Sequence, residues 1–221
     1  MNLTIFNGSP RGKRSNTAVL LEHFTNGFMT DSNNHFEIAY LNRTKDVNKN
    51  VELFEKSEHV ILAFPLYMDV MPAVVKTFIE ALEPLCRREG DLSIGFIVQG
   101  GFPEPIHSRY VEKYLAKLAN RLGRKYTGTV IKGGVEAVKF MPAWLSKKRF
   151  RPFYQLGVDY GTTAKFNEKI IRKLAPKDKL PKPRLLMFKL MRKTGLPNFY
   201  WDNQLKTNNA FEKRFDKPYI R

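Results

Sequence analysis

Short apolar runs alternate with stretches of helical periodicity over residues 1–131 of the chain. Five runs have the length and composition of strands: residues 3–6, 36–41, 59–64, 92–98 and 127–131. The third run is apolar almost throughout, which is typical of a parallel strand covered on both faces. Between the strands, apolar residues recur at three- and four-residue spacing and predict helices.

The helical stretches carry start and stop signals. Ser15 or Asn16 is a suitable N-cap for the first long helix, and Pro72 fits the first position of a later one. Gly123 is a suitable stop for a helix with an apolar side over residues 110–122. Strand and helix alternate five times. The pattern therefore predicts an α/β fold with a doubly wound, five-stranded parallel sheet in the order 2-1-3-4-5.

Charge divides the chain near residue 138. Residues 1–138 hold 17 Lys and Arg against 15 Asp and Glu, whereas residues 139–221 hold 21 against 6. Almost all of the formal net charge of +17 therefore lies in the last part of the chain. We predict a ligand-binding domain over 1–138 and a basic, mostly helical C-terminal extension over 139–221, packed on the core or on a partner subunit.

The turn after the first strand has the composition of a phosphate-binding loop. Gly8 allows a tight turn, and Ser9, Ser15, Asn16 and Thr17 supply short polar groups at the start of a helix. The positive end of the helix dipole favours an anion there, and Arg11 adds a charged contact. The loop lacks the glycine spacing of dinucleotide and nucleoside-triphosphate loops. We expect Ser15-Asn16 to cap the helix whether or not the loop binds a phosphate.

Two further loops follow the third and fourth strands. Pro65, Leu66, Tyr67, Met68 and Asp69 form a proline-framed loop whose aromatic and thioether groups suit a planar apolar ring. Taken alone, this loop is better explained as a buried turn. The second loop contains Gly100, Gly101 and Phe102, and its paired glycines allow backbone N–H groups to approach a ring closely.

The three loops converge in the predicted topology. Strands one, three and four are neighbours in the order 2-1-3-4-5, so their carboxyl ends meet at one crevice. The strings that begin at Gly8 (GSPRGKRSNT), Pro65 (PLYMDVMPAVVK) and Gly100 (GGFPE) together resemble the flavodoxin-like NAD(P)H-dependent FMN reductase family. The resemblance covers about residues 1–135 and does not extend to the C-terminal residues.

The resemblance implies a cofactor and a set of binding residues. FMN is the implied cofactor, with NADPH or NADH as electron donor. The phosphate would contact Ser9, Arg11, Ser15, Asn16 and Thr17; the isoalloxazine and ribityl groups would contact Pro65, Leu66, Tyr67, Met68 and Asp69; and Gly100, Gly101 and Phe102 would line the other edge of the ring. The implied activity passes a hydride through FMN to a small-molecule acceptor: a quinone, a nitro or azo aromatic, or free flavin. The implied chemistry needs few protein groups, and no catalytic acid or base is assigned; Tyr67 and His107 could assist protonation of an acceptor.

Other sequence features exclude several classes of protein. The single cysteine, Cys86, excludes an intrachain disulfide framework and a four-thiolate cluster. The four histidines never fall at helical ligand spacing, so no local metal motif is present. No apolar run approaches the ~18 residues of a membrane span, and no signal peptide is recognisable. We therefore expect a cytoplasmic protein.

The basic C-terminal part is open to three interpretations. Apolar residues at 166, 170 and 174 predict a helix capped by Thr162 or Thr163, and residues 184–193 mix large apolar with basic side chains. The first interpretation is packing on the core or on a second copy, in a dimer or tetramer. The second is an anionic membrane surface. The third, nucleic acid, is unlikely because no recognition motif accompanies the charge.

Two functions from other classes remain open at this point. One is a non-enzymatic, flavodoxin-type electron carrier that uses the basic extension to dock an acidic redox partner. The other is a basic membrane-surface or nucleic-acid-binding module on a flavodoxin fold. Some of the basic residues would instead serve NADPH, whose additional phosphate needs cations.

Overall fold

The computed structural model describes residues 1–88, 90–136, 138, 141–175, 178–179, 181–195, 198–217 and 219, apart from the side chains of Arg184, Arg192 and Tyr200. The chain divides into two compact units, Met1–Lys179 and Leu180–Arg221, and each is described by itself. The division by charge at residue 138 lies inside the first unit. Our assignment of domains stays a prediction.

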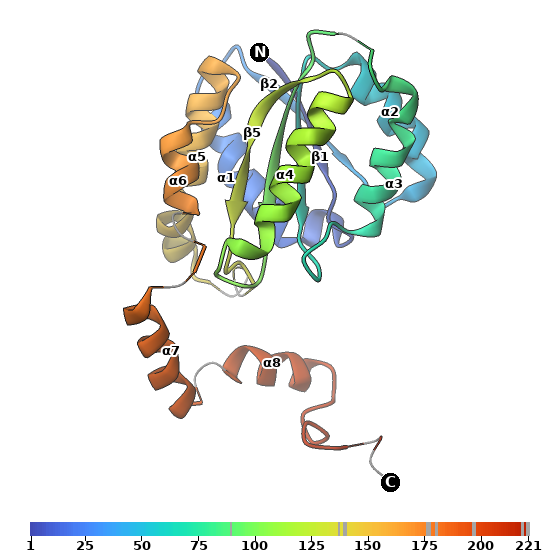
Figure 1. Ribbon diagram of the computed structural model, residues 1–221. Coiled ribbons are helices and arrows are strands. Elements are labelled where there is room, and N and C mark those ends of the chain that lie inside the picture. Colours follow the sequence, from blue (N-terminus) through green and yellow to red (C-terminus); the bar gives the residue numbers. More distant parts are fainter. Residues whose placement is uncertain are drawn as a thin grey trace. The chain divides into compact units, whose positions relative to one another are not determined.

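A five-stranded parallel sheet forms the centre of the first unit (Figure 1). Its order is β2-β1-β3-β4-β5, which confirms the predicted topology. The strands are β1 (Asn2–Asn7), β2 (His35–Tyr40), β3 (His59–Pro65), β4 (Ser93–Gln99) and β5 (Lys125–Lys132). Leu3 pairs with Phe36 on one side and with His59 on the other, so the carboxyl ends of β1, β2 and β3 lie at the same edge of the sheet.

Helices cover both faces of the sheet (Figure 1). The helices of the first unit are α1 (Asn16–Phe28), α2 (Val47–Lys56), α3 (Ala73–Ala81), α4 (Ile106–Arg121), α5 (Ala143–Thr163) and α6 (Glu168–Leu174), with short 3-10 turns at Gly12–Arg14, Thr44–Asp46 and Glu83–Leu85. Val60, Leu62 and Phe64 of β3 pack with α2, α3 and α4, whereas Ile61 and Ala63 pack with α1 and α5. The alternation follows from the two-residue repeat of a strand, and it divides the core into two layers.

Helices α1 and α5 approach each other closely. A Cβ atom on Gly157 would overlap the carbonyl oxygen of Phe24, and one on Gly27 would overlap the carbonyl oxygen of Tyr154. Phe150, Phe153, Leu156 and Tyr160 of α5 are fully buried in the same layer. Helix α5 therefore packs on α1 and shares its layer of the core.

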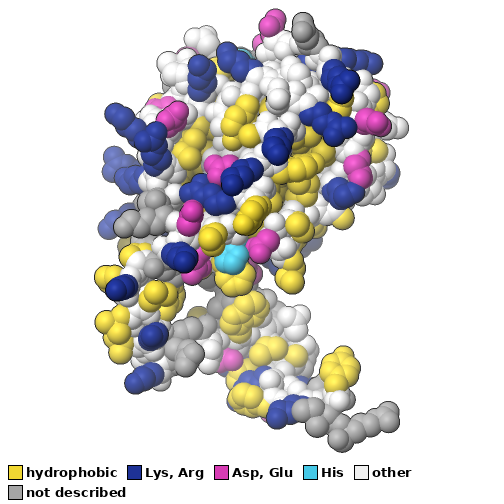
Figure 2. Space-filling view, viewed as in Figure 1, with side chains coloured by type: hydrophobic (Ala, Val, Ile, Leu, Met, Phe, Trp, Pro, Cys, Tyr) yellow, Lys and Arg dark blue, Asp and Glu magenta, His cyan; other side chains and the backbone are white. Residues whose placement is uncertain are grey.

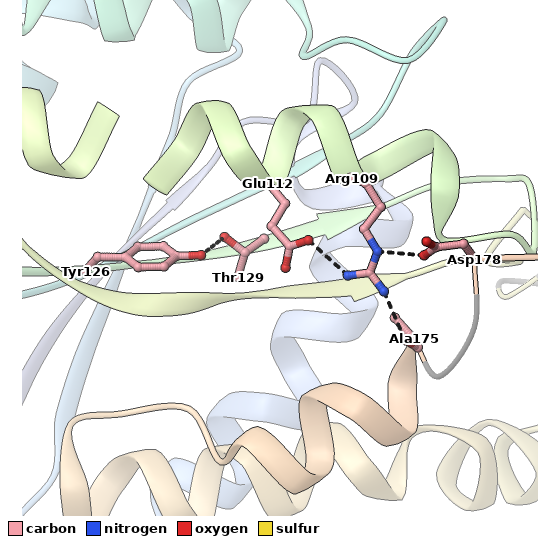
Figure 3. Close-up of polar contacts among 6 residues, drawn as sticks. All are labelled: Arg109, Glu112, Tyr126, Thr129, Ala175 and Asp178. Carbon is pink, nitrogen blue, oxygen red and sulfur yellow. Dashed lines mark hydrogen bonds and ion pairs between the residues drawn. The ribbon is translucent and has the colours of Figure 1, made fainter. Parts of the chain in front are cut away.

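A cluster around Arg109 fixes the chain after α6 (Figure 3). The guanidinium of Arg109 donates to Asp178 Oδ1 at 2.8 Å, to Glu112 Oε2 at 2.9 Å and to the carbonyl oxygen of Ala175 at 3.2 Å. On the neighbouring strand, the hydroxyls of Tyr126 and Thr129 are 2.8 Å apart. These contacts tie the last residues of the first unit to α4.

The structure corrects three details of the sequence-based prediction. Asn167, not Thr162 or Thr163, caps α6, because α5 continues through both threonines. Pro72 is the N-cap of α3 and not its first residue. Tyr110 and Tyr114 were predicted on the apolar side of α4 but are exposed. Gly123 adopts a left-handed backbone directly after the C-cap of α4, as its assignment as a stop predicts.

The second unit contains α7 (Lys182–Lys193) and α8 (Phe199–Thr207). Helix α7 begins after Pro181, which is its N-cap. No described helix in the chain is long and apolar enough to cross a bilayer.

Candidate functional site

The loop between β1 and α1 is held by its own side chains. A Cβ atom on Gly8 would collide with a side chain of α3, so glycine allows the loop to run close to that helix. Asn7 Oδ1 accepts a hydrogen bond from the N–H of Ser9 at 3.0 Å, and Ser9 Oγ accepts one from the N–H of Arg11 at 3.4 Å. The loop is therefore a compact turn that ends in the 3-10 segment Gly12–Arg14.

Two of the predicted polar side chains are used inside the protein. Ser15 Oγ accepts a hydrogen bond from the N–H of Ala18 at 3.0 Å and donates to the carbonyl oxygen of Gly12 at 2.6 Å. This confirms Ser15 as the N-cap of α1. Thr17 is fully buried, and its hydroxyl accepts a hydrogen bond from Gln99 Nε2 at 3.3 Å. Neither side chain lines the cavity described below.

The first turn of α1 retains donors for an anion. The backbone N–H groups of Asn16 and Thr17 have no acceptor within the helix, because they lie in its first turn. Together with the positive end of the helix dipole, they favour a negatively charged ligand. The exposed side chain of Arg11 lies in the same loop and adds a full positive charge.

Asn16 has an unusual set of contacts. Its Nδ2 donates to the carbonyl oxygen of Val135 at 2.9 Å and to that of Glu136 at 3.4 Å. Its Oδ1 is buried and has no hydrogen-bond partner among the described residues. A buried acceptor without a donor is costly. Because Asn16 lines the cavity, a hydroxyl or N–H of a ligand there could supply the missing bond.

The loop after β3 is a two-residue turn. The N–H of Tyr67 donates to the carbonyl oxygen of Val70 at 2.8 Å, and the N–H of Val70 donates back to Tyr67 at 3.0 Å. Between them, Met68 (φ 49°) and Asp69 (φ 63°) adopt left-handed backbone, as a type I′ turn requires. Met68 is 95% exposed at the tip. The expectation that this loop is merely a buried turn does not hold for its tip.

The loop after β4 meets this turn through an aromatic pair. The ring of Phe102 stacks on that of His107 with their centroids 4.9 Å apart. His107 Nδ1 lies 3.0 Å from Asp69 Oδ1, so the turn after β3 is connected to the start of α4. Phe102 remains 67% exposed. Its ring is available to a flat ligand on the outer side of this cluster.

A cavity of about 100 Å³ lies where the loops converge. It is lined by residues at or after the carboxyl ends of β1, β3, β4 and β5: Ser9, Arg11, Asn16, Pro65, Leu66, Tyr67, Gln99, Gly100, Gly101 and Glu136. Ligand pockets usually enclose ~300–1,000 Å³. The cavity alone would therefore enclose only part of a cofactor of the size of FMN, and the rest would lie on the exposed rim.

The structure brings together most of the residues singled out in the sequence. Ser9, Arg11, Asn16, Pro65, Leu66, Tyr67, Gly100 and Gly101 line the cavity. Met68, Asp69 and Phe102 do not line it but belong to the two loops at its rim, whereas the side chains of Ser15 and Thr17 face into the protein. FMN binding by these residues stays a prediction.

The space beside Gly100 is not filled by other atoms of the residues that the structure describes. A Cβ atom at this position would meet nothing closer than the Cβ of Leu66, 4.0 Å away. Its backbone does not adopt a positive φ, so glycine is not required for the conformation. An open position beside the cavity is consistent with a ligand that passes close to the backbone.

Two lining residues were not predicted to belong to the site. Gln99 is the last residue of β4, and its side chain donates to Thr17 at the start of α1. Glu136 comes from the segment after β5, just beyond Gly133-Gly134. That glycine pair resembles Gly100-Gly101 after β4 and is the signal that could have identified the segment. The cavity lining therefore contains a carboxylate, from Glu136, as well as the cation of Arg11.

Comparison with protein families supports the architecture. Residues 1–82 match a family model described as the flavodoxin-like fold. The strand order and this match agree. The chain has a flavodoxin-like fold. No curated protein matches its sequence.

Solved structures with the flavodoxin-like fold extend the similarity beyond the matched segment. An FMN-dependent NADH-azoreductase from Bacillus anthracis, solved with FMN, is 14% identical and has a TM-score of 0.55, with 73% of this chain and 99% of that one covered. An NAD(P)H:quinone oxidoreductase from Methanothermobacter marburgensis is 16% identical with a TM-score of 0.55, covering 74% and 96%. An NADH:FMN oxidoreductase (EMOB) in its apo form is 16% identical with a TM-score of 0.55, covering 83% and 98%. At this identity they establish the common fold.

Proposed function

We propose that the protein binds FMN at the carboxyl ends of β1, β3 and β4 and acts as an NAD(P)H-dependent oxidoreductase. The observation that carries the proposal is the cavity at these strand ends, whose lining includes Arg11, the start of α1 and Gly100-Gly101. The activities named for the three similar structures support it. The acceptor would be a small oxidised molecule such as a quinone, an azo or nitro aromatic, or free flavin.

The polar side of the cavity fits a phosphorylated polyol. The N–H groups of Asn16 and Thr17 and the guanidinium of Arg11 would hold the phosphate. A hydroxyl of the ribityl chain would donate to the buried Oδ1 of Asn16, which has no partner among the described residues. Glu136, which also lines the cavity, can accept from a further hydroxyl.

The apolar rim fits a flat ring. Tyr67, Met68 and Phe102 expose their side chains on the two loops that border the cavity. The ring would pass beside Gly100, where the protein leaves room for it. Bound FMN would supply the hydride-transfer chemistry, and these residues would orient it and shield one side from water. The exposed rim would leave the other side open to a nicotinamide or an acceptor in turn.

The visible absorption spectrum of the purified protein is the direct test of the cofactor. We expect flavin bands in the protein as purified or after incubation with FMN and gel filtration. Steady-state oxidation of NADPH and NADH with menadione or ferricyanide then tests the activity. Rapid turnover without a separate reductase would distinguish an oxidoreductase from an electron carrier. A protein that takes up no flavin would contradict the proposal.

A pair of matched variants tests the phosphate contact. Arg11→Gln should weaken FMN binding about 10- to 100-fold, since a charged hydrogen bond contributes ~1.5–3 kcal/mol. Lys13→Gln removes the same charge from the neighbouring 3-10 turn, but Lys13 does not line the cavity, so its effect should be small. Equal FMN affinity in the two variants would remove Arg11 from the site. The predicted dimer or tetramer can be measured on the same samples by light scattering.

A further inference from the structure

Helix α7 of the second unit has an apolar side and a basic side. At 100° per residue, Met187, Phe188, Leu190 and Met191 fall within one arc of about 160°, which also contains Arg184. Lys182, Lys189 and Lys193 fall on the opposite side, between Leu185 and Leu186, and are exposed. No residue of α7 is acidic. This arrangement is typical of helices that lie in the plane of a membrane surface.

The large apolar side chains of α7 are exposed within the second unit. Five of its large apolar side chains are between 43% and 59% exposed: Leu185, Leu186, Met187, Phe188 and Leu190. A soluble helix normally buries such residues, because each side chain contributes roughly 1.5–3 kcal/mol when it leaves water. So many exposed large apolar side chains on one short helix indicate an interaction surface.

The net charge of the chain argues against two possible binding partners for the apolar side of α7, namely the first unit and a second copy of the chain. Residues 180–221 hold 10 Lys and Arg against 3 Asp and Glu, and residues 1–179 hold 28 against 18. Both units are therefore net positive. Figure 2 shows Lys and Arg side chains over much of the face in view. Docking α7 on the first unit, or on a second copy of the chain, would bring like charges together.

We propose that α7 is a membrane-surface helix that binds anionic lipid bilayers. Met187, Phe188, Leu190 and Met191 would enter the boundary between headgroups and acyl chains, and Lys182, Lys189 and Lys193 would contact lipid phosphates. A bilayer satisfies both sides of the helix at once, whereas a nucleic acid would engage the basic side and leave the apolar side in water. The binding is peripheral, since α7 has 12 residues and cannot span a bilayer.

The second helix of the unit adds aromatic side chains of the type found at bilayer interfaces. Phe199 and Trp201 of α8 are more than half exposed. Tryptophan concentrates at the headgroup level, because its ring is apolar and carries a polar N–H. Trp201 is also a useful reporter, because the chain has only one other tryptophan, Trp144.

The proposal is tested by co-sedimentation of the full chain with phosphatidylcholine vesicles that either contain or lack phosphatidylglycerol. We expect binding to the anionic vesicles that weakens with added salt but persists in part, because salt screens the charges and leaves the apolar contribution. In a Trp144→Phe background, the emission of Trp201 should move to shorter wavelength on binding. Absence of binding to anionic vesicles at low salt would overturn the proposal.

Two double variants separate the contributions of the two sides. Lys189→Gln/Lys193→Gln should weaken vesicle binding about 30-fold, from ~1 kcal/mol for each cation near an anionic surface. Met187→Gln/Leu190→Gln should weaken it at least about tenfold, through lost burial of apolar area. The control Lys113→Gln/Lys117→Gln removes the same charge at the same spacing from α4 and should have a much smaller effect.

The remaining outcomes would overturn the proposal. If Met187→Gln/Leu190→Gln binds vesicles normally but unfolds more easily, the apolar side of α7 packs on the protein itself. If the same variant binds vesicles normally but has a lower mass by light scattering, that side is an interface between copies. If only the lysine variant loses binding, the contact is electrostatic and no helix inserts. None of these residues lines the cavity, so the flavin content of the variants should be unchanged, and it tests the proposed function separately.

Discussion

Helices α5 and α7 both combine basic with large apolar side chains, yet these apolar side chains have opposite environments. α5 carries Lys147, Lys148, Arg149 and Arg151 and still buries Phe150, Phe153, Leu156 and Tyr160 completely. α7 has a comparable mixture of residues, and its large apolar side chains are exposed. Overall composition therefore does not determine whether a basic helix joins a core.

The difference lies in small residues at helical spacing. Gly157 of α5 fits against the backbone of α1 at Phe24, and Gly27 of α1 fits against α5 at Tyr154. Such close approach lets the surrounding aromatic side chains interlock. The sequence of α7 contains neither glycine nor alanine, so it offers no position at which another backbone could come as near. The following predictions test this contrast, beginning with the largest effect.

The largest expected effect comes from truncating matched phenylalanines. Phe153→Ala should lower the free energy of unfolding by about 3–5 kcal/mol, because it leaves a cavity at a fully buried site. Phe188→Ala in α7 should change it by less than about 0.5 kcal/mol, as expected for an exposed side chain. Urea denaturation measures both. Similar losses in the two variants would remove the contrast between the helices.

The contact between glycine and backbone is tested by a single methyl group. Alanine is favoured over glycine in a helix by about 1 kcal/mol, so Gly157→Ala should stabilise α5 in isolation. We expect net destabilisation of at least about 2 kcal/mol, because the new Cβ overlaps the carbonyl oxygen of Phe24 and forces the helices apart. The measurement is again denaturation by urea. An unchanged or raised stability would show that α1 and α5 are less tightly packed than described.

A smaller effect is expected where the packed part of the chain ends. Arg109→Gln removes hydrogen bonds to Asp178, Glu112 and Ala175 in a half-exposed site, and it should cost about 1 kcal/mol. Arg172→Gln removes an exposed pair with Glu168 and should cost almost nothing. Proteolysis near residue 178 should also be faster in Arg109→Gln. Equal behaviour of the two variants would show that the Arg109 cluster does not hold this segment.

The smallest effect is a pH dependence of the contact between α1 and α5. Burial lowers the pKa of His23, which lies 3.3 Å from Ser146 Oγ and against the ring of Phe150, and the nearby Glu22 opposes this shift. Below its ordinary pKa of about 6.5 the unfolded chain binds a proton more readily than the folded protein. Stability should therefore be complete above that pH and decline as the pH falls through the folded pKa. His23→Gln should reduce this slope; an identical slope in both proteins would exclude His23 as its source.

Periodicity predicted the fold because each strand and helix repeats its own apolar spacing. An uninterrupted apolar run such as Val60–Phe64 indicates a strand that is covered on both faces of the sheet. The order of the strands follows from their alternation with helices. Periodicity did not reveal that Tyr110 and Tyr114 point outward, since a helix can carry aromatic residues beyond the width of its buried side. Periodicity also could not distinguish α5, whose apolar side chains are buried, from α7, whose apolar side chains are exposed. The difference depends on how closely the backbones of two helices fit together.

The candidate site was predictable where neighbouring residues in the sequence share a loop. The loops containing Ser9, Pro65 and Gly100 were found because each directly follows a strand. The inward bonding of Ser15 and Thr17 was not predictable in full, since a cap and a phosphate ligand require the same residue types. Gln99, at the end of β4, and Glu136, in the segment after β5, join the cavity through tertiary contacts; for Glu136 the preceding pair Gly133-Gly134 is a local signal, whereas Gln99 has none.

The exposed tip of the turn after β3 provides a chemical probe of ligand binding at the rim of the cavity. Met68 is the most exposed methionine of the described residues, at 95% against 48% for Met187. Mild peroxide converts accessible thioethers to sulfoxides, so peptide mass spectrometry should find Met68 modified first. A planar molecule resting on the turn would slow that oxidation and leave Met187 as an internal reference. Occupancy of the rim can thus be followed without a coloured ligand or a turnover assay.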